Sequence, residues 1–240
     1  MRIILLFLVS TIFSTGLAQI KDPSSEKYFT EIQQLANEKY GTDQQLINGS
    51  YYEYRQDRDE GHPFLFENKF SNADLIFREI EYKGIIAKYD VYNQSLILKS
   101  DLENYQITTL LAIEFVTEFS FSGMLFRKYS FNGEAPAYFQ VVSDEDEIVC
   151  LYYWHKTRIE SIHQRIYSSF KYSESKHKNY LLINEQIGQF RNNRSFVKLF
   201  PMNIQRDILS YLKSEKLRVK KVTDAEMSGI IQFSKPLLLK

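Results

Sequence analysis

The chain has 240 residues, of which 44% are hydrophobic and 25% are charged, and its formal net charge at pH 7 is zero. This composition is typical of a globular fold and excludes a wholly disordered chain. The single cysteine, Cys150, excludes an intramolecular disulfide, and with it the class of small proteins built on a disulfide framework.

The N-terminus has the three parts of a secretory signal peptide. Arg2 supplies the positive charge, residues 3–13 form a short apolar run, and small residues stand at the −3 and −1 positions of a cut between Ala18 and Gln19. The alternative is an uncleaved membrane anchor, but a spanning helix needs about 20 mostly apolar residues. We therefore expect a signal peptide over residues 1–18 and an exported protein with no transmembrane anchor after cleavage.

The first element expected after the cut is an amphipathic helix over about 26–39, which Ser24 and Ser25 can cap and Gly41 ends. From about residue 46 to residue 157 the apolar residues recur with period two, which is typical of half-buried antiparallel strands. The clearest alternating sets are Ile85, Ala87, Tyr89 and Val91, and then Ile113, Phe115, Phe119 and Phe121. Turn signals between such sets predict a meander of short strands; they are Asn48-Gly49, Gly61-His62-Pro63 and Asn132-Gly133.

The C-terminal part has a mixed pattern. Residues 158–172 are ambiguous, whereas residues 180–189 and 195–199 are predicted to form a hairpin. Pro201 then opens a helix with one apolar face, made by Ile204, Ile208, Leu209 and Leu212. The capping box from Thr223 to Glu226 predicts a last short helix over about 224–232.

These elements predict an α+β fold, with a large antiparallel, meander-like sheet, an N-terminal helix and C-terminal helices. We expect residues 19–240 to form one domain, with an acidic, strand-rich part over about 46–157 and a basic, mixed part over about 158–240. The formal charge is −11 over residues 19–149 and +10 over residues 150–240. Either the basic part faces an anionic partner, or the two parts pack together; the scattered positions of the basic residues favour packing.

The sequence lacks the common catalytic and cofactor motifs. It has no G-x-S-x-G nucleophile elbow, no phosphate-binding glycine loop, and neither H-E-x-x-H nor C-x-x-C for zinc, so no cofactor and no metal are predicted. Cys150 lies in an apolar stretch that is typical of a buried strand. Since side chains alternate along a strand, Cys150 and His155 are expected on opposite faces, which disfavours a thiol–imidazole dyad.

Three further polar groupings have a functional and a structural interpretation. Glu160 and His163 have the spacing of a di-metal ligand pair on a helix, but a single pair does not suffice. The acidic run 144–147 could attract calcium, yet a solvated turn between strands fits it better, because the run lacks the pattern of an EF-hand loop. His62 is the weak candidate for a functional histidine: Pro63 forces it into an extended conformation, where it either faces solvent or serves as a hydrogen-bonded turn residue.

Several short segments also resemble known proteins in their order along the chain. They are Asn48-Gly49 before Tyr51-Tyr52-Glu53-Tyr54, the turn Gly61-His62-Pro63-Phe64, the strand Lys88-Tyr89-Asp90-Val91-Tyr92, the segment Lys198-Leu199-Phe200-Pro201, and a helix ending in Tyr211-Leu212-Lys213. The chain thus resembles a family of uncharacterised exported proteins of Bacteroidetes-type bacteria. This resemblance implies a location in the periplasm, on the outer-membrane surface or outside the cell, and it implies no activity.

Two hypotheses for the function follow. The first is a non-catalytic binding or structural module whose partner is an envelope protein, a glycan or a lipid; export disfavours a nucleic-acid partner. The alternative is a hydrolase of envelope polymers that uses paired carboxylates. A carboxylate pair at about 5–10 Å facing a groove would favour the hydrolase, and a closed, aromatic-packed sheet would favour the binding module.

Overall fold

A computed structural model describes residues 50–52, 59–102, 105–131, 133–163 and 167–239, all of them in one compact unit that spans Tyr40–Lys240. The predicted signal peptide, its cleavage site between Ala18 and Gln19, and the predicted helix over 26–39 lie outside the described residues. The strands and the C-terminal helices lie within them.

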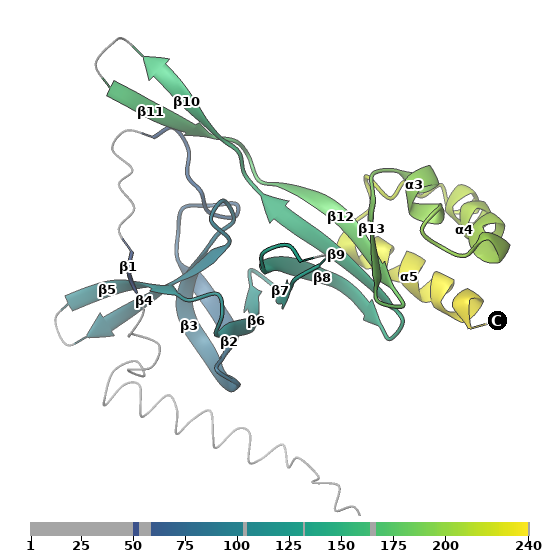
Figure 1. Ribbon diagram of the computed structural model, residues 1–240, viewed down its shortest axis with the longest axis horizontal. Helices are drawn as coiled ribbons and strands as arrows, with labels where there is room; N and C mark the ends of the chain where they lie inside the picture. Colours follow the sequence, from purple (N-terminus) through teal and green to yellow (C-terminus); the bar gives the residue numbers. More distant parts are fainter. Residues whose placement is uncertain (1–49, 53–58, 103–104, 132, 164–166, 240) are drawn as a thin grey trace, which may run out of the picture. The chain divides into compact units, whose positions relative to one another are not determined.

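The predicted large antiparallel sheet is confirmed. Eleven strands form one sheet in the order β1-β5-β4-β3-β2-β6-β7-β8-β9-β12-β13, in which most strands lie beside their neighbours in sequence (Figure 1). Its strands are β1 (Ser50–Tyr51), β2 (Ser71–Phe77), β3 (Ile80–Asp90), β4 (Ser95–Leu102), β5 (Tyr105–Leu111), β6 (Val116–Phe121), β7 (Met124–Tyr129), β8 (Ala137–Glu145), β9 (Ile148–His155), β12 (Lys176–Ile183) and β13 (Gln186–Phe190). The ambiguous segment forms a separate antiparallel hairpin of β10 (Arg158–His163) and β11 (Tyr167–Tyr172).

The period-two pattern predicts the buried face well where the strand is regular. In β3, Ile85, Ala87 and Tyr89 are buried and Ile86 is exposed. The prediction is wrong at the start of the second alternating set, because residues 113–115 form a turn and β6 begins only at Val116. Phe115 is accordingly exposed; its ring lies at the edge of the core, 5.9 Å from the ring of Phe77, and the guanidinium of Arg78 lies over it at 4.3 Å.

Three helices follow the sheet: α3 (Asn193–Val197), α4 (Met202–Ser214) and α5 (Asp224–Leu238). As predicted, α4 buries the face that carries Ile204, Ile208 and Leu212. The capping box of α5 is present, since Thr223 Oγ1 accepts from Glu226 N at 3.2 Å and Glu226 Oε2 accepts from Thr223 N at 2.7 Å. The helix continues six residues beyond the predicted end at residue 232. None of the described helices is long and apolar enough to cross a membrane.

The predicted pairing of 180–189 with 195–199 is wrong. The chain turns earlier, between β12 and β13, where Asn184 and Glu185 both have positive φ, 46° and 65°. This backbone suits a tight hairpin turn, and asparagine tolerates it better than most residues. Residues 193–197 are helical because Asn192 caps them: its Oδ1 accepts from Ser195 N at 2.9 Å.

The interior is divided among separate hydrophobic clusters. One cluster lies under β2–β7 and is rich in aromatic rings; Tyr89 contacts Phe119, Phe126 and Tyr138 at 5.1–6.1 Å between ring centroids. A second cluster lies between β9, β12, β13 and the three helices. A third, smaller cluster is centred on Phe139, Val149 and Leu151. Since strand side chains alternate, Val149 and Leu151 lie on the face opposite to the helix-covered Cys150.

Candidate functional site

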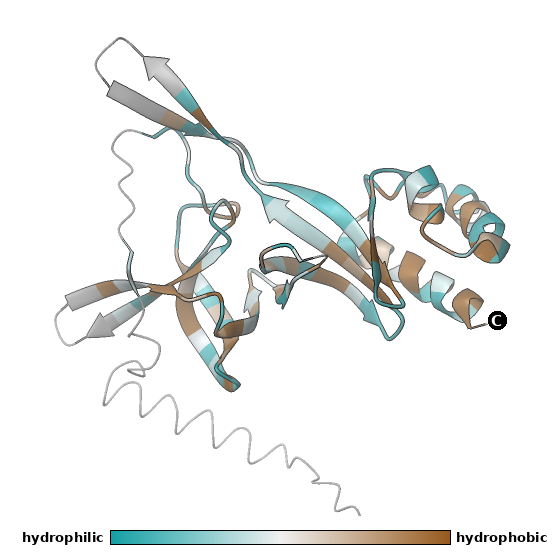
Figure 2. Ribbon diagram, in the orientation of Figure 1, coloured by the Kyte–Doolittle hydropathy of each residue, from teal (hydrophilic) through white to brown (hydrophobic). Residues whose placement is uncertain are grey.

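Strand β12 changes from polar to mostly apolar residues along its length. It begins with the polar residues 176–179 and ends with Tyr180-Leu181-Leu182-Ile183, a change that is visible as teal followed by brown in Figure 2. Strand β9 pairs with all of β12, whereas β13 pairs only from Asn179 onward. The outer edge of β12 from Lys176 to Lys178 therefore borders a groove instead of another strand.

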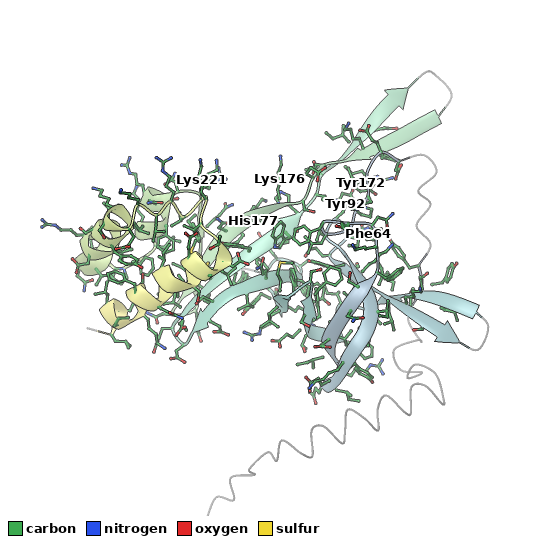
Figure 3. The ribbon with its side chains drawn as sticks, turned by 180° about the vertical axis from the view of Figure 1, so that it is seen from behind. Phe64, Tyr92, Tyr172, Lys176, His177 and Lys221 are labelled. Atoms are coloured by element: carbon green, nitrogen blue, oxygen red, sulfur yellow. The ribbon has the colours of Figure 1, made fainter. Side chains whose placement is uncertain are left out.

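This groove has a volume of about 590 Å³ and is lined by positive charge. The cationic side chains come from three places: Lys176 and Lys178 from β12, Arg191 from the residue after β13, and Lys220 from the loop before α5. All four residues are exposed. The other lining residues are His155, Ser175, His177, Asn179, Gln189 and Phe190. None of the described residues that line it is acidic. We call this site the basic groove; Figure 3 labels Lys176, His177 and Lys221, the neighbour of Lys220.

One wall of the basic groove is built on contacts between aromatic rings. The ring of His177 stacks on Tyr152 with 4.4 Å between centroids and 22° between planes, and it lies 4.7 Å from Trp154. His177 Nδ1 is 2.6 Å from Asn179 Oδ1. Because an amide oxygen only accepts a hydrogen bond, this contact places the proton on Nδ1.

A chain of hydrogen bonds supports this wall from below. Trp154 Nε1 donates to Gln140 Oε1 at 2.7 Å, and Gln140 Nε2 donates to Asp224 Oδ2 at 2.6 Å. Asp224 is the first residue of α5, so the helix start is tied to the strands beneath His177. Gln140 is buried, and buried polar groups whose hydrogen bonds are satisfied hold a site in one arrangement.

Burial and the lysines of the groove lower the pKa of His155, the second histidine in its lining. Burial is the main cause that lowers the pKa of His155, and the ammonium groups of Lys178 and Lys176 lower it further. His155 stands opposite Lys176 in the β9–β12 pairing, so both side chains leave the same face of the sheet. An anion bound in the groove would act in the opposite direction and favour the protonated imidazole.

No protein-family model matches the chain, and no curated protein and no solved structure matches it either. Membership in a family of exported proteins is therefore our proposal, and the site must be judged on its own chemistry.

The candidate histidine of the sequence, His62, lies elsewhere. Its carbonyl oxygen accepts from Lys156 Nζ at 2.9 Å, and its ring stacks on Phe64 at 5.8 Å. The next residue, Pro63, accepts from Val91 N at 3.1 Å, so this loop is fastened to the end of β3. Burial and the nearby Lys156 ammonium lower the pKa of His62. The geometry is that of a packed turn residue, and His62 does not line the basic groove.

Asp90, in the strand segment Lys88–Tyr92 of the resemblance, organises a turn. Its carboxylate accepts from Tyr92 N at 3.0 Å, from Asn93 N at 2.8 Å and from Asn93 Nδ2 at 2.8 Å. Asp90 is fully buried, and burial raises the pKa of its carboxyl group although these hydrogen bonds act against the rise. Its oxygens are occupied by the β3–β4 turn, which is a structural role.

The remaining sequence candidates do not come together. Cys150 is buried under the helices while His155 faces the basic groove, as the alternation predicts, and burial raises the pKa of the Cys150 thiol. The helical spacing considered for Glu160 and His163 is wrong, because both lie on strand β10. Among the described residues, no group of His, Cys, Asp and Glu could hold a metal ion.

The acidic run 144–147 forms the end of β8 and the turn into β9, as predicted. Three of its four carboxylates have cationic partners: Lys235 Nζ lies 2.6 Å from Asp146 Oδ2 and 3.4 Å from Glu145 Oε2, and Arg127 Nη1 lies 2.8 Å from Asp144 Oδ2. The pairs with Lys235 join the acidic and basic parts of the chain, as the packing interpretation expects. The packing interpretation did not predict the basic groove, which four cationic side chains line.

Proposed function

We propose that the chain is an exported, non-catalytic binding module whose basic groove takes an anionic ligand. The observation that carries this proposal is the lining of the groove: four exposed cations surround about 590 Å³, with no acidic residue among the described lining residues. An anion in the groove would be attracted by these four charges. The exported location rests on the predicted signal peptide and on the resemblance to exported proteins.

The groove is suited to binding and lacks the groups for paired-carboxylate hydrolysis. Such hydrolysis needs one carboxyl group as acid and a second as base or nucleophile, and the described lining of the groove supplies neither. Hydrolysis of an envelope polymer remains the alternative prediction, and analysis of the probe for cleavage products after each titration tests it.

The proposal is tested by titrating the purified protein with polyglutamate and with polyphosphate, using calorimetry at low and at physiological ionic strength. The test variant is Lys176→Ala/Lys220→Ala, and the matched control is Arg206→Ala/Lys213→Ala, which removes two exposed charges from α4. Each exposed ion pair contributes about 0.2–1 kcal/mol. The loss of two pairs should therefore weaken binding by the test variant about twofold to thirtyfold, whereas the control should bind like the wild type. Equal affinity of all three proteins, or no binding by the wild type, would overturn the proposal.

A further inference from the structure

We infer that the anionic ligand is an acidic saccharide, because a pocket of aromatic side chains adjoins the basic groove and shares Lys178 with it. This inference rests on the proposed function. The second pocket has a volume of about 380 Å³, and we call it the aromatic pocket. It is lined by five aromatic residues, together with Glu134 and Lys178; the aromatic residues are Tyr129, Phe131, Phe139, Tyr153 and Tyr180.

Pairing in the sheet places this pocket on the face away from the helices. Tyr153 stands opposite Lys178, and Tyr180 stands opposite Leu151. Side chains of directly opposed residues leave the same face of a sheet. Tyr152 and Cys150, which alternate with these residues along β9, belong to the cluster under the helices. The aromatic pocket is therefore a surface of β8, β9 and β12 that no described helix covers.

The rings form a base with walls around it. Phe139 is buried and provides the base, with the rings of Tyr129, Phe131 and Tyr180 meeting it edge to face at 5.5–5.9 Å between centroids. Tyr129 and Phe131 stack on each other at 5.3 Å with 12° between planes. The four wall residues, Tyr129, Phe131, Tyr153 and Tyr180, are only partly buried, so ring surface faces the pocket.

Polar groups stand at the rim of this apolar surface. Burial raises the pKa of the Tyr153 and Tyr180 hydroxyl groups, so both stay protonated and can donate hydrogen bonds. The Glu134 carboxylate is an acceptor, and the Lys178 ammonium is a donor. A saccharide ring has an apolar C–H face and a rim of hydroxyl groups, and aromatic faces with a few placed polar groups are complementary to both.

The shared lysine links this surface to negative charge. Lys178 lines the aromatic pocket and the basic groove, so one ligand can reach both. A polymer of sugar acids carries C–H faces for the aromatic pocket and carboxylate groups for the four cations. An acidic peptide added beside β12 would find only the short free edge from Lys176 to Lys178 and would leave the aromatic pocket unused.

The experiment compares two probes of matched charge, a galacturonate decasaccharide and decaglutamate, in titrations of the purified protein. Phe131→Leu/Tyr180→Leu removes two rings and retains apolar side chains. Phe115→Leu is the matched control, because it removes an exposed ring that does not line the pocket. Thermal melting and circular dichroism verify that each variant is folded. If a double variant melts below the assay temperature, the single variants Phe131→Leu and Tyr180→Leu replace it.

We expect the aromatic variant to bind the decasaccharide about tenfold more weakly, which corresponds to about 1.4 kcal/mol, and to bind decaglutamate within twofold of the wild type. Lys176→Ala/Lys220→Ala should lose affinity for both probes. If the aromatic variant loses no more affinity for the saccharide than Phe115→Leu does, or if the wild type prefers decaglutamate, the saccharide inference fails while the anion site stands. If the wild type binds neither probe, the proposed function fails as well.

Discussion

Gln94 is the residue whose loss should most disturb the support of the site. Its Oε1 accepts from the Tyr89 hydroxyl at 2.8 Å and from Tyr138 N at 3.3 Å, while its Nε2 donates to Val91 O at 2.8 Å and to Trp154 O at 3.0 Å. One side chain thus joins the β3–β4 turn to β8 and to β9, the strand beneath His177.

Replacing Gln94 with leucine removes these four hydrogen bonds and leaves the fully buried Tyr89 hydroxyl without its acceptor. A stranded buried donor costs about 1–3 kcal/mol, and each lost hydrogen bond contributes about 1 kcal/mol. The stranded hydroxyl and the three other lost hydrogen bonds together should lower the free energy of unfolding of Gln94→Leu by about 4–6 kcal/mol. Urea denaturation followed by tryptophan fluorescence measures this directly, because Trp154 is the only tryptophan.

A double-mutant cycle separates the stranded hydroxyl from other effects of the substitution. Tyr89→Phe removes the donor and should cost about 1 kcal/mol. Gln94→Leu should then cost about 1–2 kcal/mol less in the Tyr89→Phe background than in the wild type, because no hydroxyl is left stranded. Additive costs in the cycle, or a loss below about 0.5 kcal/mol for Gln94→Leu alone, would refute this reasoning.

Three further predictions follow from the described contacts. Thr223→Ala removes the capping box of α5 and should lower the free energy of unfolding by about 1 kcal/mol. Thr223→Ser should retain most of the stability that the cap contributes. An unchanged urea midpoint for Thr223→Ala would contradict the role of the cap. Cys150 is fully buried and burial raises the pKa of its thiol, so a thiol reagent such as DTNB should modify it only at the rate of unfolding; fast modification of the native protein would exclude the described packing. The pKa values of His62 and His155 are lowered in the folded state. The unfolded chain therefore binds more protons, and the free energy of unfolding should fall as the pH drops below about 6.5. His62→Gln/His155→Gln should flatten this decline in urea titrations between pH 5 and pH 8, and an identical decline in the variant would contradict the role of these histidines.

Regular elements of this fold could be predicted from sequence because their patterns are local. Period two identifies the buried face of β3, an apolar face identifies α4, and the capping box identifies the start of α5. The β12–β13 turn could not be predicted because neither of its positive-φ residues, Asn184 and Glu185, is a glycine. Glycine is the residue that normally marks such a turn in a sequence. Once that turn was missed, the apolar residues Phe196 and Val197 were assigned to a strand, although Asn192 caps them as a helix.

The basic groove could not be predicted because its residues are brought together only by the fold. Lys176 and Lys220 are distant in sequence, and they meet because β13 stops opposite Asn179 and the chain returns from α4 to α5 beside the open edge. The one available signal was the change from polar to apolar residues within β12. The aromatic pocket depends in the same way on rings from separate strands, and its tyrosine and phenylalanine residues are indistinguishable in sequence from those of the core.

The most direct test of a basic groove that binds an anionic ligand is the salt dependence of binding to the galacturonate decasaccharide. Affinity should fall steeply as ionic strength rises from about 0.05 M to 0.3 M, because exposed charges are screened beyond about 8 Å near physiological salt, and Lys176→Ala/Lys220→Ala should show a shallower dependence. An affinity that is the same at both ionic strengths, or the same dependence in wild type and variant, would contradict the account.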